Sequence, residues 1–360
     1  MKTVMTEVFA TLGPKCADED ILYRMLLEGM SGMRLNLSHT SLEESRELIG
    51  HYQNAMDRAG VQAQLLIDLQ GGELRIGRFF DGLLLESGSE IELMPEDVQD
   101  GSASHSQALA RGMMVVNRNG GIPVPRRVLA ALDEGDEILL DDGRILLRVE
   151  RTGGSARTHV IRGGQLTGGK SIKVRDKDIK GDILTRQDME NLRICRDFGV
   201  TAIMQPFVTS GEDLRLIRDF LRREGISQPR IFAKIENRQG VEHLDSIIPE
   251  ADMIVIARGD LGNDVPLWAL PAVQKNVSRR CRNAGCPFLV VTQMLSSMIH
   301  SPIPTRAEVS DIFNAVADGA AAVMVTNETA VGDYPVEVMR YLHQTVREAE
   351  DWREHERRDE

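Results

Sequence analysis

Several short apolar runs of this chain end in residues that can do chemistry. Lys234 and Glu236 close the run RIFAKIE, and Asp260 follows the run MIVIARG. Lys234 and Glu236 are two residues apart, so on a strand their side chains leave the same face. Two carboxylates on adjacent strands suit a hard divalent cation such as Mg²⁺, and a nearby lysine can neutralise charge on a phosphoryl group or an enolate. The alternative is a salt-bridge network of these carboxylates with Lys234 and Arg258.

A second set of oxygen donors follows two earlier runs. Asn36 and Ser38 lie at the end of GMRLNLS, and Asp68 ends QLLID. Amide, hydroxyl and carboxylate oxygens of this kind fit a monovalent cation or a second divalent cation. Further polar residues at the ends of apolar runs extend the set to Thr11, Arg34, Thr292, Thr326 and Glu328. Only one run ends in apolar residues, at Pro206-Phe207.

These residues need elements that bring the ends of the runs together. Short apolar runs without strict alternation are typical of parallel strands that are covered on both faces. The predicted strands are Val8–Thr11, Gly32–Ser38, Gln64–Asp68, Val200–Gln205, Arg230–Glu236, Asp252–Arg258, Pro287–Thr292 and Ala321–Thr326. Each is followed by a helical pattern, so we predict an α/β fold, a (β/α)₈ TIM barrel whose active site lies at the C-terminal ends of the strands.

The helical patterns carry start and stop signals. The predicted helices are Asp18–Glu28, Leu42–Ala59, Gln187–Phe198, Gly211–Glu224, Val241–Ile248, Leu267–Ala284, Arg306–Asp318 and Val336–Glu350. Ser41 with Glu44, and Thr305 with Glu308, have the spacing of capping boxes. Glycines at positions 60, 199, 225 and 319 fit the left-handed residue that ends a helix. Residues 351–360, DWREHERRDE, are predicted to be a frayed, solvated tail.

One connection is much longer than the others. The third strand ends near Asp68, and its helix begins only near Gln187. Between them lie β-like runs with Gly-rich turns, at 90–93, 114–117, 137–140, 145–149 and 158–161. We therefore predict a barrel over 1–70 and 170–350 with an inserted all-β, barrel-like lid domain over 71–169. Its hinges are predicted at Gly71-Gly72 and Gly163–Gly169, where it could close over the active site.

The composition restricts the class of protein. The chain has 360 residues, of which 42% are hydrophobic, and a net charge of −12. This hydrophobic fraction can bury a core, and the acidic charge disfavours general binding to nucleic acid or anionic membranes. No apolar run is long enough to cross a membrane, and the four cysteines form no CxxC pair. We expect a cytoplasmic protein with no nucleic-acid or membrane partner.

The motifs resemble those of the pyruvate kinase family, in that family's order and over nearly the whole chain. The N-terminal matches are TLGP at 11–14, RLNLSH at 34–39, DLQGGELR at 68–75, DDG at 141–143 and GG at 163–164. The later matches are KIEN at 234–237, ARGDLG at 257–262, TQML at 292–295, PTRAEVSD at 304–311, NAV at 314–316 and ETA at 328–330.

The resemblance implies transfer of a phosphoryl group from phosphoenolpyruvate to ADP, giving pyruvate and ATP in glycolysis. By it, Lys234, Thr292 and Arg34 would be catalytic, and Glu236 and Asp260 would hold Mg²⁺. Substrate contacts would come from Arg34, Gly259, Asp260 and Thr292. A K⁺ ion would be bound by Asn36, Ser38, Asp68 and the carbonyl of Leu69, and Glu73 lies where K⁺-dependent members carry a glutamate. The nucleotide contacts would be Asn36, His39, Arg75 and Lys170.

The chain also departs from the family pattern. Gln70 and Gly72 replace a usual lysine and proline, Pro206 replaces a serine, and Thr326-Asn327 replaces Ser-Gly. The stretch SIKVRDKDIKG after Lys170 is likewise unusual. We expect the C-terminal domain that usually binds the allosteric effector to be absent. A homo-oligomer through barrel faces is expected from the resemblance.

Two other functions remain open from the sequence. Because several departures lie on the nucleotide side, one alternative is a 2-oxo-acid lyase or decarboxylase that uses the same metal and enolate chemistry without a nucleotide. The other is a non-catalytic regulatory homologue. The retention of Lys234, Glu236 and Asp260 counts against the latter, since a scaffold has no need of them.

Overall fold

The computed structural model describes residues 5–38, 40–77, 79, 82–96, 121–141, 143–177, 179, 181–226 and 229–359, with side chains up to Glu356. The chain forms two compact units. The first contains residues up to Gly72 and from Asp182 onward, and the second runs from Glu73 to Gly181.

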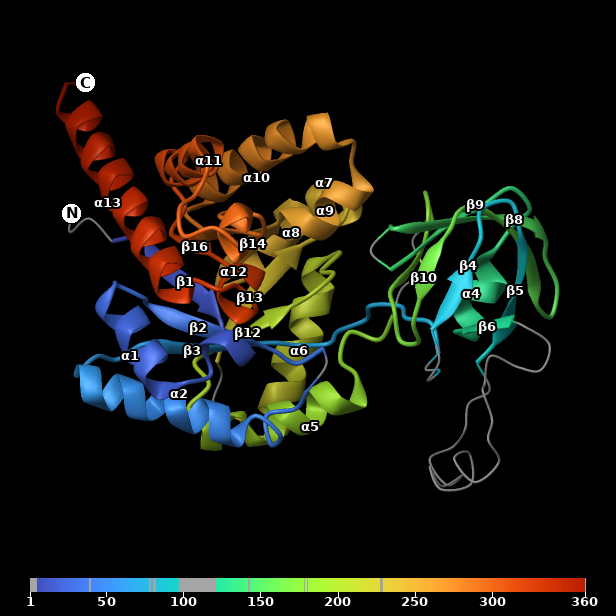
Figure 1. Ribbon diagram of the computed structural model, residues 1–360, viewed down its shortest axis with the longest axis horizontal. Helices are drawn as coiled ribbons and strands as arrows, with labels where there is room; N and C mark the ends of the chain where they lie inside the picture. Colours follow the sequence, from blue (N-terminus) through green and yellow to red (C-terminus); the bar gives the residue numbers. More distant parts are fainter. Residues whose placement is uncertain are drawn as a thin grey trace. The chain divides into compact units, whose positions relative to one another are not determined.

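The first unit is built on a closed barrel of parallel strands, with helices around its outside (Figure 1). Its strands are β1 (Glu7–Thr11), β2 (Gly32–Asn36), β3 (Gln64–Asp68), β12 (Ala202–Gln205), β13 (Arg230–Ile235), β14 (Met253–Ala257), β15 (Phe288–Val291) and β16 (Ala322–Met324). They pair in the order β1-β16-β15-β14-β13-β12-β3-β2. The predicted fold class and all eight predicted barrel strands are therefore confirmed.

Alternate residues of each strand face two different cores. In β14, Met253, Val255 and Ala257 belong to the core inside the barrel, while Ile254 and Ile256 pack with the core beneath the helices. Because side chains alternate along a strand, the residue two positions after an inward-facing residue also faces inward. Phe232 and Leu66 are inside the barrel. The strand period therefore sends Lys234 and Asp68, each two residues later, into the C-terminal mouth of the barrel.

The helices follow the predicted order with local differences. They are α1 (Glu19–Leu27), α2 (Arg46–Ala59), α5 (Arg186–Ile194), α6 (Gly211–Arg223), α7 (Arg238–Glu242), α8 (Leu244–Ile247), α9 (Arg258–Asp264), α10 (Leu270–Ala284), α11 (Arg306–Ala317), α12 (Asn327–Ala330) and α13 (Pro335–Asp359). The predicted capping box at Thr305 and Glu308 is present. The predicted start of the second helix at Leu42 is wrong. Ser41 and Glu44 do exchange the cap hydrogen bonds, at 2.8 and 3.2 Å, but only around a turn that precedes α2.

The frayed C-terminal tail is a second correction. Helix α13 continues to Asp359, far beyond the predicted end at Glu350. Trp352 lies against Phe313 of α11, with ring centroids 5.5 Å apart, and Arg353 donates to the Val316 carbonyl at 3.0 Å. These two contacts hold the segment against α11, although its charged composition alone predicted a solvated, frayed tail.

The second unit is mostly antiparallel sheet. Its strands are β4 (Leu83–Leu85), β5 (Glu90–Pro95), β6 (Gly121–Val124), β7 (Glu137–Leu140), β8 (Ile145–Arg151), β9 (Ala156–Arg162), β10 (Gly164–Leu166) and β11 (Ile172–Val174), with the short helix α4 (Arg126–Ala131). Six strands form one sheet in the order β11-β7-β8-β9-β5-β6, and β10 pairs with β4. The run at 114–117 lies outside the described residues.

The unit also differs from the insert predicted over 71–169. Gly164–Leu166 form strand β10, which pairs with β4, and the hinge between Gly163 and Gly169 stays a prediction. The segment after Lys170 contributes β11, which pairs with β7, and the unit therefore extends to Gly181. Both features, the strand β10 and the extension to Gly181, depend on pairing with strands distant in the sequence. The local glycine content does not predict such pairing.

Candidate active site

Asp68 is the centre of an ion cluster in the barrel mouth. It ends β3 and is only 1% exposed. Arg34, from β2, donates to its carboxylate with Nε at 2.8 Å and Nη2 at 2.6 Å. Lys234, from β13, places Nζ 3.3 and 3.2 Å from the two oxygens. Burial by itself would raise the pKa of Asp68, but the two cations outweigh that effect and lower the pKa, so the carboxylate stays ionised.

Lys234 bridges this cluster to a second carboxylate. Its Nζ lies 3.0 Å from Oε1 of Glu236, directly after β13. Burial opposes the charge on Lys234, yet Asp68 and Glu236 together raise the pKa of its ammonium above the ordinary value. Lys234 therefore carries a fixed positive charge at neutral pH and cannot serve as a base.

The negative charge of Glu236 has fewer cationic partners than that of Asp68, since Glu236 pairs with Lys234 alone whereas Asp68 pairs with both Arg34 and Lys234. Its Oε2 accepts the Phe207 N–H at 2.8 Å, and its side chain is buried. Burial first, and then the carboxylates of Asp260 and Asp68 against the opposing effect of Lys234, raise the pKa of Glu236 to about 7. Asp260 lies in the first turn of α9, a helix that the Gly-rich sequence around it did not predict.

The charges of the cluster fit a divalent cation. Three carboxylates, of Asp68, Glu236 and Asp260, face the two cations of Arg34 and Lys234. Burial first, and then repulsion by Asp260 and Asp68, disfavours the charged form of Glu236, and a cation bound beside it would offset both effects. Within the described part of the chain, no group of three His, Cys, Asp or Glu residues could ligate a metal ion by itself. A site with two protein carboxylates suits Mg²⁺, which keeps several water or substrate oxygens.

Thr292 and Gly259 form a neighbouring polar edge. Thr292 follows β15 with φ of 75°, an uncommon left-handed conformation for a β-branched residue, and Gln293 continues it with φ of 55°. The Thr292 hydroxyl oxygen accepts the Gly259 N–H at 2.8 Å. Strained backbone of this kind is often found at functional sites, and here it places a hydroxyl beside the start of α9.

The residues predicted to bind K⁺ lie on β2, β3 and the segments that follow them. Asn36 and Asp68 are register partners, and the Asp68 carbonyl accepts the Leu37 N–H at 2.9 Å. The Asn36 side-chain oxygen accepts the Ser38 N–H at 3.2 Å. The structure thus brings Asn36, Ser38, Asp68 and the Leu69 backbone to adjacent strand ends. His39 lies outside the described residues.

Arg258 and Glu328, which also follow barrel strands, have partners away from the ion cluster. Arg258 donates to Asp311 of α11 and to the Thr292 carbonyl, each at 2.6 Å. Glu328 is 1% exposed and accepts the N–H groups of Leu295 and Thr326, at 3.2 and 2.7 Å. The Lys234–Glu236 pair of the alternative salt-bridge network is thus present, while Arg258 forms its ion pair with Asp311.

Two predicted nucleotide contacts lie together in the second unit. Arg75 forms an isolated antiparallel bridge with Ser171 and donates to the Gly169 carbonyl at 2.9 Å. Lys170 places Nζ 2.7 Å from the buried carboxylate of Asp141. Asp142, in the DDG motif, lies outside the described residues.

Asp188, in the first turn of α5, is a polar residue that the sequence reading missed. It is fully buried, and its carboxylate accepts the N–H groups of Gln70 and Gly71 at 2.8 and 3.0 Å. The pattern T-x-x-D at 185–188 could have signalled the helix cap but not these distant partners. One of the family departures, Pro206, also lies here. Gly71 has φ of 57°, and a Cβ on it would lie 2.4 Å from Cγ of Pro206.

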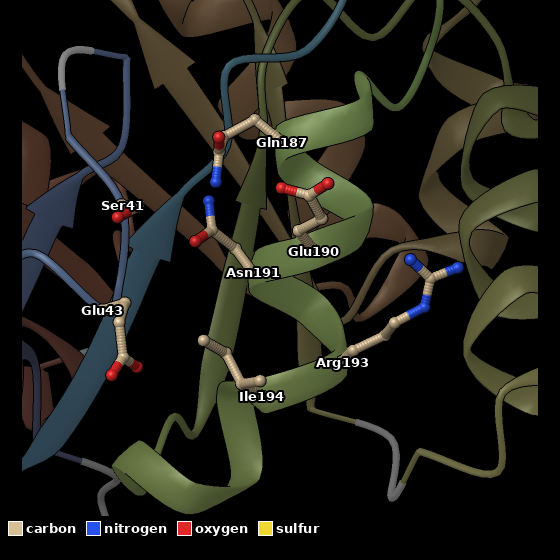
Figure 2. Close-up of a pocket in the computed structure, with 7 residues that line it drawn as sticks. All are labelled: Ser41, Glu43, Gln187, Glu190, Asn191, Arg193 and Ile194. Atoms are coloured by element: carbon tan, nitrogen blue, oxygen red, sulfur yellow. The ribbon is translucent and has the colours of Figure 1, made fainter.

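A shallow pocket of about 350 Å³ lies elsewhere on the first unit (Figure 2). Its lining residues are Ser41, Glu43, Gln187, Glu190, Asn191, Arg193 and Ile194. None of them is a predicted site residue. Figure 2 shows Asn191 pointing from α5 toward the segment of Ser41 and Glu43, and its side-chain oxygen accepts the Leu42 N–H at 3.0 Å. The pocket thus lies where α5 is hydrogen-bonded to the segment that precedes α2.

Comparisons with known proteins agree with this geometry. The family model described as "Pyruvate kinase, barrel domain" matches residues 3–339. The chain belongs to the pyruvate kinase family. A pyruvate kinase of Corynebacterium efficiens is 35% identical over 347 residues, which is 96% of this chain and 70% of that protein. A pyruvate kinase of Aeropyrum pernix is 35% identical over 338 residues, 93% of this chain and 69% of that protein.

Membership of the pyruvate kinase family confirms the predicted resemblance and the class of phosphotransferase enzyme. A pyruvate kinase of Geobacillus stearothermophilus is 34% identical over 354 residues, which is 97% of this chain but 58% of that protein. Among the described helices, none combines the length and the apolar character that a membrane crossing requires. A cytoplasmic location and a homo-oligomer through barrel faces stay predictions from the sequence.

Proposed function

We propose that this chain transfers the phosphoryl group of phosphoenolpyruvate to ADP, with Mg²⁺ and K⁺ as its cations. The observation that carries the proposal is the Lys234 ammonium, whose side chain is only 14% exposed and which is held between Asp68 and Glu236 in the mouth of the barrel. A cation fixed there, away from bulk water, acts on charge that develops during the reaction far more strongly than it would in solvent.

Lys234 is proposed to stabilise the transferring phosphoryl group and the enolate that it leaves. Because its pKa is raised, the ammonium keeps its proton throughout and acts through charge alone. Arg34, which is fixed by Asp68 and also lies 3.3 Å from the Thr11 hydroxyl, is proposed to bind an anionic group of the substrate. The Gly259 N–H and the Thr292 hydroxyl, already joined by a hydrogen bond, are proposed as the other side of the substrate site.

Glu236 and Asp260 are the proposed Mg²⁺ ligands, and the mutual repulsion of their carboxylates supports this assignment. When bound, Mg²⁺ would polarise phosphoryl and carbonyl oxygens as a Lewis acid. Asn36, Ser38, Asp68 and the Leu69 carbonyl are the proposed K⁺ ligands, since they offer hard oxygens at adjacent strand ends.

The nucleotide contacts are proposed at Asn36, His39, Arg75 and Lys170. The last two belong to the second unit, which we propose acts as a lid during phosphoryl transfer. Exclusion of water matters for this reaction, because water would compete with ADP for the phosphoryl group. Deletion of Glu73–Gly181 with a short bridging linker should abolish phosphoryl transfer in a barrel that still melts cooperatively.

A coupled assay of pyruvate formation tests the proposal. Pyruvate should form from phosphoenolpyruvate only when ADP and Mg²⁺ are both present, with ATP produced in equal amount. K⁺ should increase the rate, and choline at the same ionic strength should not. Pyruvate formed from oxaloacetate without ADP, in the absence of ADP-dependent activity, would replace this function with the 2-oxo-acid lyase alternative.

A further inference from the structure

The loop that leaves β3 is held by a carboxylate from a distant helix. The Leu69 N–H still follows the barrel ladder and donates to the Met204 carbonyl at 3.1 Å. The next two N–H groups, of Gln70 and Gly71, leave the ladder and donate to the carboxylate of Asp188 in α5. Its Oδ1 accepts the Gln70 N–H at 2.8 Å, and its Oδ2 accepts the Gly71 N–H at 3.0 Å.

The same carboxylate also holds the chain where it returns to the first unit. Oδ2 of Asp188 accepts the Thr185 N–H and the Thr185 hydroxyl, both at 2.9 Å. Gln205, at the end of β12, adds a second brace by donating to the Ile183 carbonyl at 3.0 Å. Helix α5 is itself fixed by Asn191, which accepts the Leu42 N–H at 3.0 Å (Figure 2). Asp188 therefore has little freedom to follow the loop.

One of these hydrogen bonds fixes the direction of a carbonyl. The Gln70 N–H and the Leu69 carbonyl belong to a single peptide group. The described backbone has no cis peptide bond, and in a trans peptide these two groups point in opposite directions. By holding the N–H end, Asp188 turns the carbonyl end away from itself and fixes its orientation. That carbonyl directly follows Asp68, the carboxylate at the centre of the ion cluster.

We propose that Asp188 is a positioning residue for the monovalent-cation site, because it aims the Leu69 carbonyl at the ion. This inference rests on the proposed K⁺ site of the preceding section. A carbonyl ligand held in place before binding need not be ordered by the ion, so loss of the constraint weakens K⁺ binding. Loss of this constraint does not alter Lys234, Glu236 or Asp260. The turnover at saturating K⁺ should therefore stay close to that of the wild type.

Asp188→Asn tests the proposal, because the amide cannot accept all of the N–H groups that the carboxylate accepts. The K⁺ concentration that gives half-maximal activity should rise about tenfold, the equivalent of one ordinary hydrogen bond. The turnover at saturating K⁺ should stay within about threefold of the wild type. Deuterium uptake of the peptide that contains Leu69, Gln70 and Gly71 should rise, and this readout does not depend on activity.

Asp213→Asn is the matched control. Asp213 is also a buried capping-box aspartate and accepts the N–H groups of Thr209 and Ser210, at 2.8 and 3.0 Å, but it holds a different loop. It should lower stability much as Asp188→Asn does without changing the K⁺ constant. Asp188→Glu, which keeps the charge, should give an intermediate K⁺ constant and serves if Asp188→Asn does not fold.

The outcomes separate the inference from the proposed function. Equal K⁺ constants in the two Asn variants, or a fall in turnover at saturating K⁺ with no change in the K⁺ constant, would make Asp188 merely structural. If the wild type forms no pyruvate, the proposed function fails. The K⁺-dependent rise in melting temperature then still tests Asp188, and it should require about tenfold more K⁺ in Asp188→Asn. A wild type that responds to K⁺ in neither assay overturns the inference.

Discussion

Two polar clusters at the mouth of the barrel look alike in sequence but differ in what their charges do. In the cluster around Asp68, the carboxylates of Asp68 and Glu236 pair with Arg34 and Lys234, and the nearby Asp260 carboxylate adds further negative charge. In the second cluster, the Arg258 guanidinium donates hydrogen bonds to Asp311 and to the Thr292 carbonyl. The first cluster is left able to bind further cations and anions, whereas the second joins β14, β15 and α11. A charged strand end is therefore a candidate site only when its partners leave charge uncompensated.

The largest expected difference between the clusters is in catalysis. Lys234→Met should reduce kcat by about 10³-fold, because it removes a largely desolvated cation that acts on developing charge. The corresponding change in the other cluster, Arg258→Met, should mainly lower stability, since it leaves the Asp311 carboxylate unpaired. Steady-state kinetics with thermal melting of both variants makes the comparison. A Lys234→Met enzyme within tenfold of the wild-type kcat would remove the distinction between the clusters.

The second prediction concerns the pH dependence of stability without metal. The pKa of Glu236 is raised to about 7, so its contribution to stability is fully present below its unfolded pKa of about 4.5. That contribution is lost as the pH rises through 7, and it amounts to something on the order of 3 kcal/mol. Unfolding in urea between pH 4.5 and 8, with EDTA, should show this loss in the wild type and not in Glu236→Gln.

Mg²⁺ supplies the control for the pH prediction. A divalent cation beside Glu236 favours the ionised carboxylate, so saturating Mg²⁺ should abolish the difference in pH dependence between the wild type and Glu236→Gln. If the difference persists unchanged in Mg²⁺, then Glu236 is not a metal ligand.

The smallest expected effect is at Glu328, whose partners are backbone N–H groups. Glu328→Gln should lower the free energy of unfolding by about 1–3 kcal/mol, because an NH₂ group replaces one acceptor in a buried site. The turnover should change less than threefold. Chemical denaturation and the coupled assay check both parts. A large loss of turnover with unchanged stability would place Glu328 with the Asp68 cluster.

Much of the site could be predicted from the sequence because strand geometry is periodic. Phe232 and Lys234 share a strand face, as do Leu66 and Asp68, so a residue that ends an inward-facing row must lie in the barrel mouth. The capping box at Thr305 was predictable for a similar reason, since all of its partners lie within one helical turn. Local rules failed at the C-terminal tail, where contacts with Phe313 and Val316 extend α13 to Asp359.

By itself, the sequence determined the eight barrel strands, the residue types at their ends and the family to which the chain belongs. These follow from local periodicity and from motifs that need no knowledge of distant contacts. The tertiary structure decided which ends act together. Only the closed barrel brings Lys234 to Asp68, across 166 positions of sequence, and only the packing of α5 brings Asp188 to Gln70, across 118. The physical reason is that charge compensation and buried hydrogen bonds depend on distance in space, and no spacing in the sequence encodes that distance.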